Sequence, residues 1–282
     1  MEYPLTQTTN LKPVTKWVGG KRQLLPQLSQ FIPSNYERYY EPFVGGGALL
    51  FSLAPDKVTI NDMNAELIQV YQVIKENPEE LLRLLEHHAS HNTKEYYLEI
   101  RNLDRDGTID QMSAVERSAR ILYMLRVDFN GLYRVNKKGQ FNVPYGRNKN
   151  PKIANRDNIM AVSNYFNKID IEFLNTDFEN SVQTANKRDF VYFDPPYIPL
   201  TLTSDFTSYT ANGFTLKDQE RLRNLFFELA KSGTYVMLSN SDTQLTRELY
   251  ADANIHEALA SRSINSNGKK RGKIGELIIT SY

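Results

Sequence analysis

A short extended run that passes through three glycines into an apolar segment constrains the fold of this chain more than any other feature. Tyr39 to Phe43 is strand-forming, and Gly45 to Gly47 precede an apolar stretch typical of a helix. A second expected strand, Val58 to Asn61, ends at Asp62, and Asn64 begins a helix with apolar residues on one face. This order of elements predicts part of an open, doubly wound, mostly parallel α/β sheet.

The glycine turn and Asp62 together favour a ligand that contains a nucleoside. Glycines let the backbone approach a ligand closely, and a carboxylate at the end of the next strand can accept hydrogen bonds from two ribose hydroxyls. A purely structural turn remains the alternative, because a glycine-rich turn alone is a weak signal.

The tetrapeptide Asp194-Pro195-Pro196-Tyr197 closes the strand-forming run Phe190 to Phe193. Neither proline has an N–H, so the backbone cannot continue a sheet ladder, and we expect its carbonyls to be free for a ligand. Asp194 adds a carboxylate acceptor and Tyr197 a stacking face. A planar group with an exocyclic amine, such as adenine, could donate both hydrogens to this site. The alternative is a strand that merely ends in a proline turn.

Composition predicts one sizeable core with a smaller appended domain, since the chain has 282 residues and 40% hydrophobic content. The net charge is only +1, but the cations are unevenly placed. Residues 131–156 contain seven cations and no carboxylate, namely Arg134, Lys137, Lys138, Arg147, Lys149, Lys152 and Arg156. Aromatic residues and turn signals are interleaved with them, which predicts a hairpin or loop that binds a phosphate backbone.

Several classes of protein are excluded or disfavoured. The chain has no cysteine, which excludes disulfides, thiolate metal sites and the cytosine methyltransferases that form a covalent thiol adduct. No apolar stretch is long enough to span a bilayer and residues 1–10 lack a signal-peptide core, so we expect a cytoplasmic protein without membrane contact. His87 and His91 have metal-ligand spacing, but nothing completes a site, and no metal is expected.

The remaining patterns predict the organisation of the chain. We expect helix over residues 79–102, a capping box at Ser113 and Glu116, and a helix from about Leu216 to Ala230. Further strands are expected at Ile171 to Leu174, Phe190 to Phe193, Tyr235 to Leu238 and Leu277 to Thr280. We predict that residues 1–75 and 160–282 form a catalytic domain, with residues 76–159 as an inserted helical subdomain that carries the basic hairpin.

These motifs, in this order, resemble the Dam-type DNA adenine methyltransferases of the alpha group, which use S-adenosylmethionine. The resemblance covers most of the chain and is carried by Lys16 to Lys21, Glu41 to Gly47, Asn130 to Arg134, Phe141 to Arg147, Thr176 to Phe178, Ser239 to Thr243 and the tail from Asn265 to Gly268 through Glu276 and Leu277. The chain departs from the common pattern of the family at Val18, Phe129 and Asn148. The resemblance implies a methyltransferase sheet, S-adenosylmethionine as methyl donor, double-stranded DNA as partner, the palindrome GATC as target, and a bacterial or phage protein that works on the nucleoid.

Residue by residue, the resemblance implies three functional groups. The catalytic group is Asp194, Pro195, Pro196 and Tyr197. The cofactor-binding group is Trp17, Lys21, Phe43, Gly45, Gly47, Asp62, Asp177, Phe178 and Asp194. The DNA-binding group is Lys16, Phe129, Asn130, Leu132, Arg134, Pro144 and Arg147, in which Phe129 would wedge into the base stack and Arg134 would read a guanine.

The expected chemistry follows from the weakness of the nucleophile. The lone pair of the adenine amino nitrogen is delocalised into the ring, so an enzyme must accept its hydrogens while the nitrogen turns toward the methyl group. Asp194 and the Pro195 carbonyl can do this once the base has been flipped out of the duplex. Alternatives are a methyltransferase for adenine in RNA, a nicotinamide-dependent oxidoreductase, and a DNA-binding module without activity. The oxidoreductase gives no role to the tetrapeptide, and the binding module does not explain a cofactor pocket. The sequence leaves the oligomeric state open, a monomer included.

Overall fold

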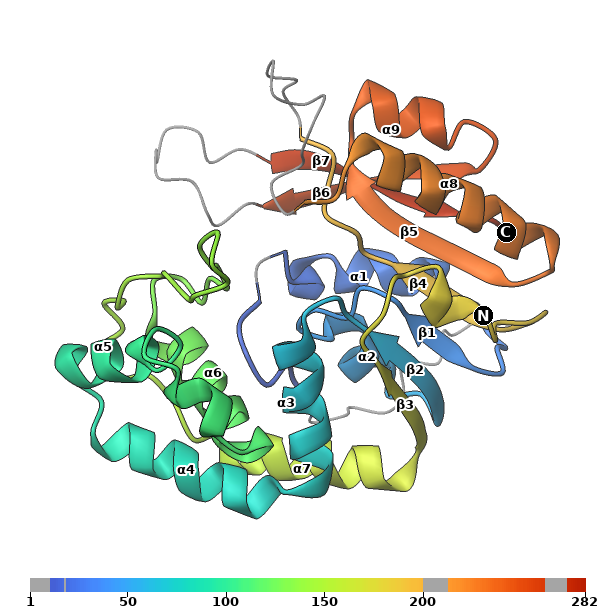
Figure 1. Cartoon of the computed structure of the whole chain (residues 1–282). Helices are drawn as coiled ribbons and strands as arrows, with labels where there is room; N and C mark the ends of the chain where they lie inside the picture. The colour runs from blue at the N-terminus through green and yellow to red at the C-terminus, as the bar shows by residue number, and fades with distance from the viewer. Residues whose placement is uncertain (1–10, 18, 200–212, 262–272) are drawn as a thin grey trace.

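The computed structural model describes residues 11–17, 19–199, 213–261 and 273–282. Two sequence features, Val18 and the tail residues 265–268, lie outside these ranges. The described residues form a mixed α/β fold around a seven-stranded sheet with strand order β3-β2-β1-β4-β5-β7-β6 (Figure 1). The strands are β1 (Tyr39–Glu41), β2 (Lys57–Asn61), β3 (Asp170–Leu174), β4 (Phe190–Phe193), β5 (Tyr235–Ser241), β6 (Asn254–Ser261) and β7 (Lys273–Thr280).

The first five strands in the chain pair in parallel, whereas β7 runs antiparallel to both β5 and β6. The expected strands are therefore confirmed, and β6 is an addition that the sequence patterns did not predict. The α-helices among the described residues are α1 (Leu25–Leu28), α2 (Ala48–Leu53), α3 (Ala65–Glu76), α4 (Pro78–Ser90), α5 (Lys94–Asn102), α6 (Ala114–Val127), α7 (Arg156–Lys168), α8 (Leu216–Lys231) and α9 (Gln244–Leu249).

Both faces of the sheet are buried, as expected for a doubly wound fold. Successive residues of a strand point to opposite faces, so Tyr39 belongs to one core cluster and Tyr40 to the other. The larger cluster joins the sheet to helices α1 to α7, and the smaller joins it to α8. Figure 1 shows α4, α6 and α7 gathered well away from α8 and α9.

Side-chain caps explain where several helices begin. The Asn64 side chain accepts a hydrogen bond from Leu67 N at the start of α3, and Ser113 and Glu116 form the expected capping box of α6. The helix expected over residues 79–102 is confirmed for most of its length, but it is divided in two, because α4 ends at Ser90. Thr93 then caps a second helix by accepting from Tyr96 N.

The cationic segment forms an irregular hairpin over residues 128–147, which we call the basic hairpin. Its two arms meet at isolated antiparallel bridges, Asp128 with Tyr145 and Val135 with Phe141, rather than in continuous strands. The tip turns between Asn136 and Gln140, where Asn136 N donates to Gln140 O over 2.9 Å. The turn signals in the sequence thus predicted the hairpin correctly.

The division into a catalytic and an inserted domain stays a prediction. Buried residues of α4 and α6 belong to the same core cluster as those of α3, β1 and β2. In the described part of the chain, no helix is both long and apolar enough to cross a membrane.

Candidate active site

The two sequence motifs meet where the order of the sheet reverses. Strand β1 pairs with β2 on one side and with β4 on the other, so the connections after β1 and after β4 leave in opposite directions. Such a switch point, at the carboxyl ends of the strands, is where open α/β sheets bind ligands. The glycine turn follows β1 and the tetrapeptide Asp194 to Tyr197 follows β4.

One ammonium group fixes both reactive members of the tetrapeptide. Lys21 Nζ lies 2.7 Å from Asp194 Oδ1 and 4.4 Å from the centroid of the Tyr197 ring. It also donates to the Gly19 carbonyl over 2.7 Å. The hydroxyl of Tyr197 donates to Glu276 Oε2 on β7 over 3.0 Å. The acid and the ring therefore have fixed positions relative to each other.

The environment of Asp194 weakens its acidity. Its side chain is 18% exposed, and this burial raises its pKa to about 6, a shift that Glu276 adds to and Lys21 opposes. The carboxylate is ionised at neutral pH and can accept a hydrogen bond.

The two proline carbonyls differ, which corrects the expectation that both are free. The Pro196 carbonyl accepts a hydrogen bond from Gln219 Nε2 of α8 over 2.9 Å. No described residue donates to the Pro195 carbonyl. Just beyond the tetrapeptide, Ile198 N donates to Asn240 Oδ1 of β5 over 3.0 Å. Pro196 thus holds the turn in place, whereas the described residues leave the Pro195 carbonyl without a donor.

The glycine turn has a backbone conformation and close neighbours that require glycine. Gly45 has a φ of +46°, and a Cβ there would lie 2.9 Å from Trp17 Cδ1, so both conformation and space require glycine. Gly47, with a φ of +67°, would place a Cβ 2.9 Å from the Phe51 ring. The turn is anchored because Tyr71 donates to the Gly45 carbonyl over 2.7 Å.

Asp62 holds the end of β2 against this turn. Its Oδ2 accepts from Gly45 N over 3.0 Å and its Oδ1 from Asn64 N over 2.9 Å. Burial raises the pKa of Asp62, while these two N–H groups oppose the shift. Each carboxylate oxygen has a second lone pair, so the side chain can still accept from a ligand hydroxyl.

The remaining cofactor candidates are Phe43, Asp177 and Phe178, and the two phenylalanine rings pack together. The Phe43 and Phe178 rings lie 5.5 Å apart. Phe178 is buried, and the Arg221 guanidinium lies 4.8 Å over its ring. Arg221 Nη2 also lies 2.8 Å from Asp177 Oδ1. The same Oδ1 accepts from Glu179 N over 3.0 Å, so the printed bonds of the Asp177 carboxylate are made by one of its two oxygens.

The basic hairpin carries six of the seven DNA-binding candidates, and the seventh, Lys16, packs against its base. Phe129 is 54% exposed, and Asn130 has a φ of +65°. Arg134 donates from Nε to Asn142 Oδ1 over 2.7 Å and from Nη2 to Asn142 O over 3.1 Å. The other members, Lys16, Leu132, Pro144 and Arg147, are exposed or half-buried. The structure therefore brings the group together on one projecting element.

Sequence reasoning missed several residues that shape the site. Gln219 comes from α8, and no local pattern marks it, whereas Glu276 on β7 belongs to the tail that carries the resemblance but was assigned no role in the site. Met63 follows Asp62 and is 68% exposed, so its apolar side chain is accessible beside the carboxylate. The sequence could have marked Met63, because this residue directly follows Asp62, the carboxylate at the end of a predicted strand. Among the residues described, no group of three or more His, Asp or Glu could hold a metal.

Comparison with known proteins agrees with this geometry. The D12 class N6 adenine-specific DNA methyltransferase family matches residues 17–264. The Type II methyltransferase M1.LlaDCHI of Lactococcus lactis subsp. cremoris is 58% identical over 273 residues, which cover 97% of this chain and 96% of that protein. The DNA adenine methylases of Vibrio cholerae and Escherichia coli K12 are 36% and 34% identical, covering 93% of this chain and 93% and 92% of their own lengths. The chain therefore belongs to the D12 class of N6 adenine-specific DNA methyltransferases.

Proposed function

We propose that the protein transfers a methyl group from S-adenosylmethionine to the exocyclic amine of an adenine flipped out of duplex DNA, within the sequence GATC. The observation that carries this proposal is the joint fixing of Asp194 and Tyr197 by Lys21, next to the glycine turn. The carboxylate acceptor of Asp194, the stacking face of Tyr197 and the backbone of the glycine turn then lie close together.

The residues at the turn fit an adenosine-bearing donor. A Cβ at Gly45 would collide with Trp17, so the turn can pack this closely against the indole only with glycine there. Asp62 has lone pairs for ribose hydroxyls, and the exposed Met63 offers an apolar face beside it. Trp17, Lys21, Phe43, Gly47 and Phe178 complete the proposed pocket, with Asp177 near the donor's ring. When bound, S-adenosylmethionine supplies a methyl group that its sulfonium has already activated.

The chain's own residues prepare the amine. Asp194 accepts one amino hydrogen and the Pro195 carbonyl accepts the other, which lets the nitrogen lone pair turn out of the ring plane. Tyr197 stacks on the base, and its bond to Glu276 fixes the ring's orientation. Lys21 keeps Asp194 in place and favours its ionised form.

The basic hairpin, within a target-recognition region of residues 76–159, supplies the DNA contacts. Arg134 and Asn130 lie at base-reading positions, and Lys16 and Arg147 face phosphates. Phe129 fills the gap that the flipped base leaves; flipping costs a few kcal/mol. The names of the relatives support this reading, since they are DNA adenine methylases and a Type II methyltransferase. The latter also supports a place in a restriction-modification system.

The test is to incubate the purified protein with labelled S-adenosylmethionine and unmethylated plasmid DNA, and to map modified bases by sequencing. Parallel samples contain RNA of the same sequence and a plasmid in which every GATC has been altered. We expect N6-methyladenine at GATC in DNA alone. Label in RNA or at another sequence would overturn the substrate or the target, and no label at all would overturn the activity.

A further inference from the structure

The base of the basic hairpin interlocks with the segment that precedes Lys21. A Cβ at Gly131 would lie 2.5 Å from Lys16 Cβ, so the hairpin backbone is pressed against this side chain. Two residues further along, the Tyr133 ring stacks on the Trp17 ring with centroids 5.5 Å apart and planes inclined by 28°. Lys16 and Trp17 are thus held by the first arm of the hairpin.

Trp17 also contacts the glycine turn. A Cβ at Gly45 would lie 2.9 Å from Trp17 Cδ1, and one at Gly46 would lie 3.2 Å from Trp17 Cβ. The indole therefore lies between the backbone of the glycine turn and the ring of Tyr133. A movement of the glycine turn is therefore transmitted to Tyr133, and a movement of Tyr133 to the turn, through close-packed atoms.

Tyr133 has a second connection to the cofactor side of the molecule. Its hydroxyl donates to Glu66 Oε2 over 2.9 Å, and Glu66 lies in the first turn of α3, the helix that Asn64 caps. Burial and the Glu66 carboxylate raise the pKa of Tyr133, which keeps the hydroxyl protonated as a donor.

The second arm of the hairpin is connected to the same glutamate. Buried Arg120 places Nη2 3.0 Å from Asp104 Oδ2 and Nη1 3.9 Å from Glu66 Oε1. Asp104 Oδ2 in turn accepts from Phe141 N over 2.7 Å. The Phe141 ring meets the Tyr133 ring edge-on at 5.9 Å. Both arms of the hairpin therefore converge on Tyr133 and Glu66.

We propose that Tyr133 is a positioning residue that couples the two binding sites, so that binding of the methyl donor and binding of target DNA strengthen each other. The inference rests on the proposed function, which assigns the glycine turn to the donor and the hairpin to DNA. Tyr133 lies between Leu132 and Arg134, so the arm that orients the base-reading side chains is the arm that stacks on Trp17. Because the coupling is a free energy shared by two sites, each ligand must raise the affinity for the other by the same factor.

The coupling factor is the ratio of the dissociation constants of a GATC duplex measured without and with saturating S-adenosylhomocysteine. This cofactor product permits no turnover. In the unaltered protein we expect the cofactor product to tighten duplex binding at least about fivefold. Tyr133→Leu removes the stack and should reduce this factor to below about twofold, while Tyr133→Phe keeps the ring and should lie between. The matched control is Tyr165→Phe, which loses a 2.8 Å hydrogen bond to the Pro55 carbonyl away from both sites and should keep the full factor.

A spectroscopic readout makes the test independent of affinity. Trp17 is the only tryptophan in the chain, so intrinsic indole fluorescence reports on the surroundings of this one side chain, which include the Tyr133 ring and the glycine turn. Adding the duplex should change the emission of the unaltered protein and of Tyr165→Phe, but not that of Tyr133→Leu. An unaltered protein that binds both ligands without coupling would overturn the inference, as would a Tyr133→Leu variant that keeps the coupling factor. An unaltered protein that binds neither ligand would instead overturn the proposed function.

Discussion

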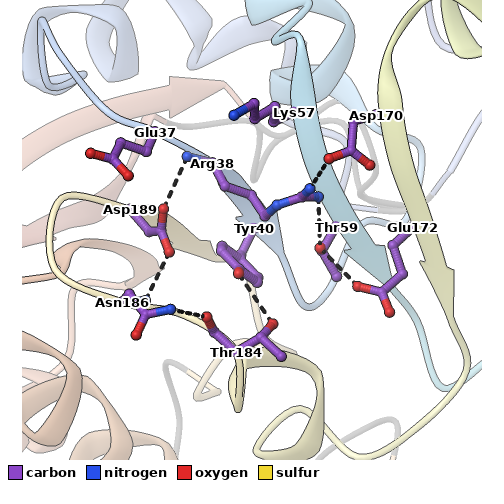
Figure 2. Close-up of a pocket in the computed structure, with 10 residues that line it drawn as sticks. All are labelled: Glu37, Arg38, Tyr40, Lys57, Thr59, Asp170, Glu172, Thr184, Asn186 and Asp189. Atoms are coloured by element: carbon purple, nitrogen blue, oxygen red, sulfur yellow. Dashed lines mark hydrogen bonds and ion pairs between the residues drawn. The ribbon is translucent and has the colours of Figure 1, made fainter.

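Charged side chains have different partners at the two ends of the parallel strands. At the carboxyl ends, Lys21 and Glu276 contact Asp194 or the Tyr197 side chain. At the amino ends lies a polar cavity of about 600 Å³, whose lining Figure 2 shows. The proposed catalytic residues lie at the opposite ends of the strands from this cavity.

The charged groups at the amino ends bond mainly to each other and to the backbone. Arg38 pairs with the Asp170 carboxylate and donates to the Val58 carbonyl over 3.1 Å. Asp189 accepts from the backbone N–H groups of Arg38 and Asn186 over 3.0 and 2.8 Å. These bonds join the starts of neighbouring strands, so the cavity has a structural role.

Exposure accounts for much of the difference. The Asp170 side chain is 62% exposed, whereas that of Asp194 is 18% exposed. Water screens the first carboxylate, while desolvation makes the interactions of the second stronger. The exposed carboxylate at one end therefore serves attachment, and the buried one at the other end suits the catalytic role that we propose for it.

The largest expected effect comes from removing the catalytic carboxylate. Asp194→Ala should lower the single-turnover rate of methyl transfer by about 10³-fold or more, because the amino hydrogens lose their charged acceptor. Duplex binding, measured by anisotropy, should stay within a few-fold. Asp170→Ala at the other end is the matched control and should leave the rate within about twofold. Retained turnover in Asp194→Ala would refute the assigned role.

Local motifs explain why this much of the site could be predicted from sequence. The tetrapeptide and the glycine turn are contiguous, and prolines or glycines restrict their backbone directly. The partners that tune them are not contiguous. Glu276 reaches Tyr197 from β7 and Gln219 reaches Pro196 from α8, and only the folded sheet brings these residues together.

The same distinction applies to the fold. Strands β1, β2 and β4 were predicted because each is a short apolar run bounded by a glycine turn or a carboxylate, and the basic hairpin because its turns have local signatures. The break between α4 and α5 depends on Thr93, a single capping residue within a continuous helical pattern. The amino-end cavity has no sequence signature, since single charged residues at the starts of separate strands line it.

A second experiment compares Arg134 on the basic hairpin with Arg188 at the amino ends of the strands. Arg134→Ala should reduce discrimination between GATC and duplexes with one altered guanine by about 1–3 kcal/mol, or roughly 5- to 150-fold, because a bidentate contact to guanine is lost. Competition binding measures this ratio. Arg188→Ala, which removes an exposed partner of Glu37 at the amino end, should leave discrimination unchanged. Equal discrimination in the two variants would exclude Arg134 as the reader.

The pH profile gives a smaller effect with a defined sign. Asp194 must be ionised to accept the amino hydrogen, and its pKa is raised to about 6, so kcat/KM should fall about tenfold per unit below that pH. Glu276 is one cause of the raised pKa, so Glu276→Gln should shift the fall to lower pH. Glu172→Gln at the amino end is the control and should leave the profile unchanged. A fall in kcat/KM that begins only near pH 4 would contradict the raised pKa of Asp194. An upward shift of the profile in Glu276→Gln would contradict the contribution of Glu276 to that pKa.

The smallest effect is expected at the amino-end cavity. Arg38→Met removes the ion pair with Asp170 and the hydrogen bond to the Val58 carbonyl, which together tie β1 to β2 and β3. Most of the loss comes from the hydrogen bond to the backbone, because Asp170 is exposed and its ion pair is screened. Urea denaturation should therefore show a decrease of about 1–2 kcal/mol in the free energy of unfolding, while the rate of methyl transfer by the folded variant stays within about twofold. A rate that falls much further in folded protein would mean that the amino ends contribute to catalysis, and the contrast between the two ends would no longer hold.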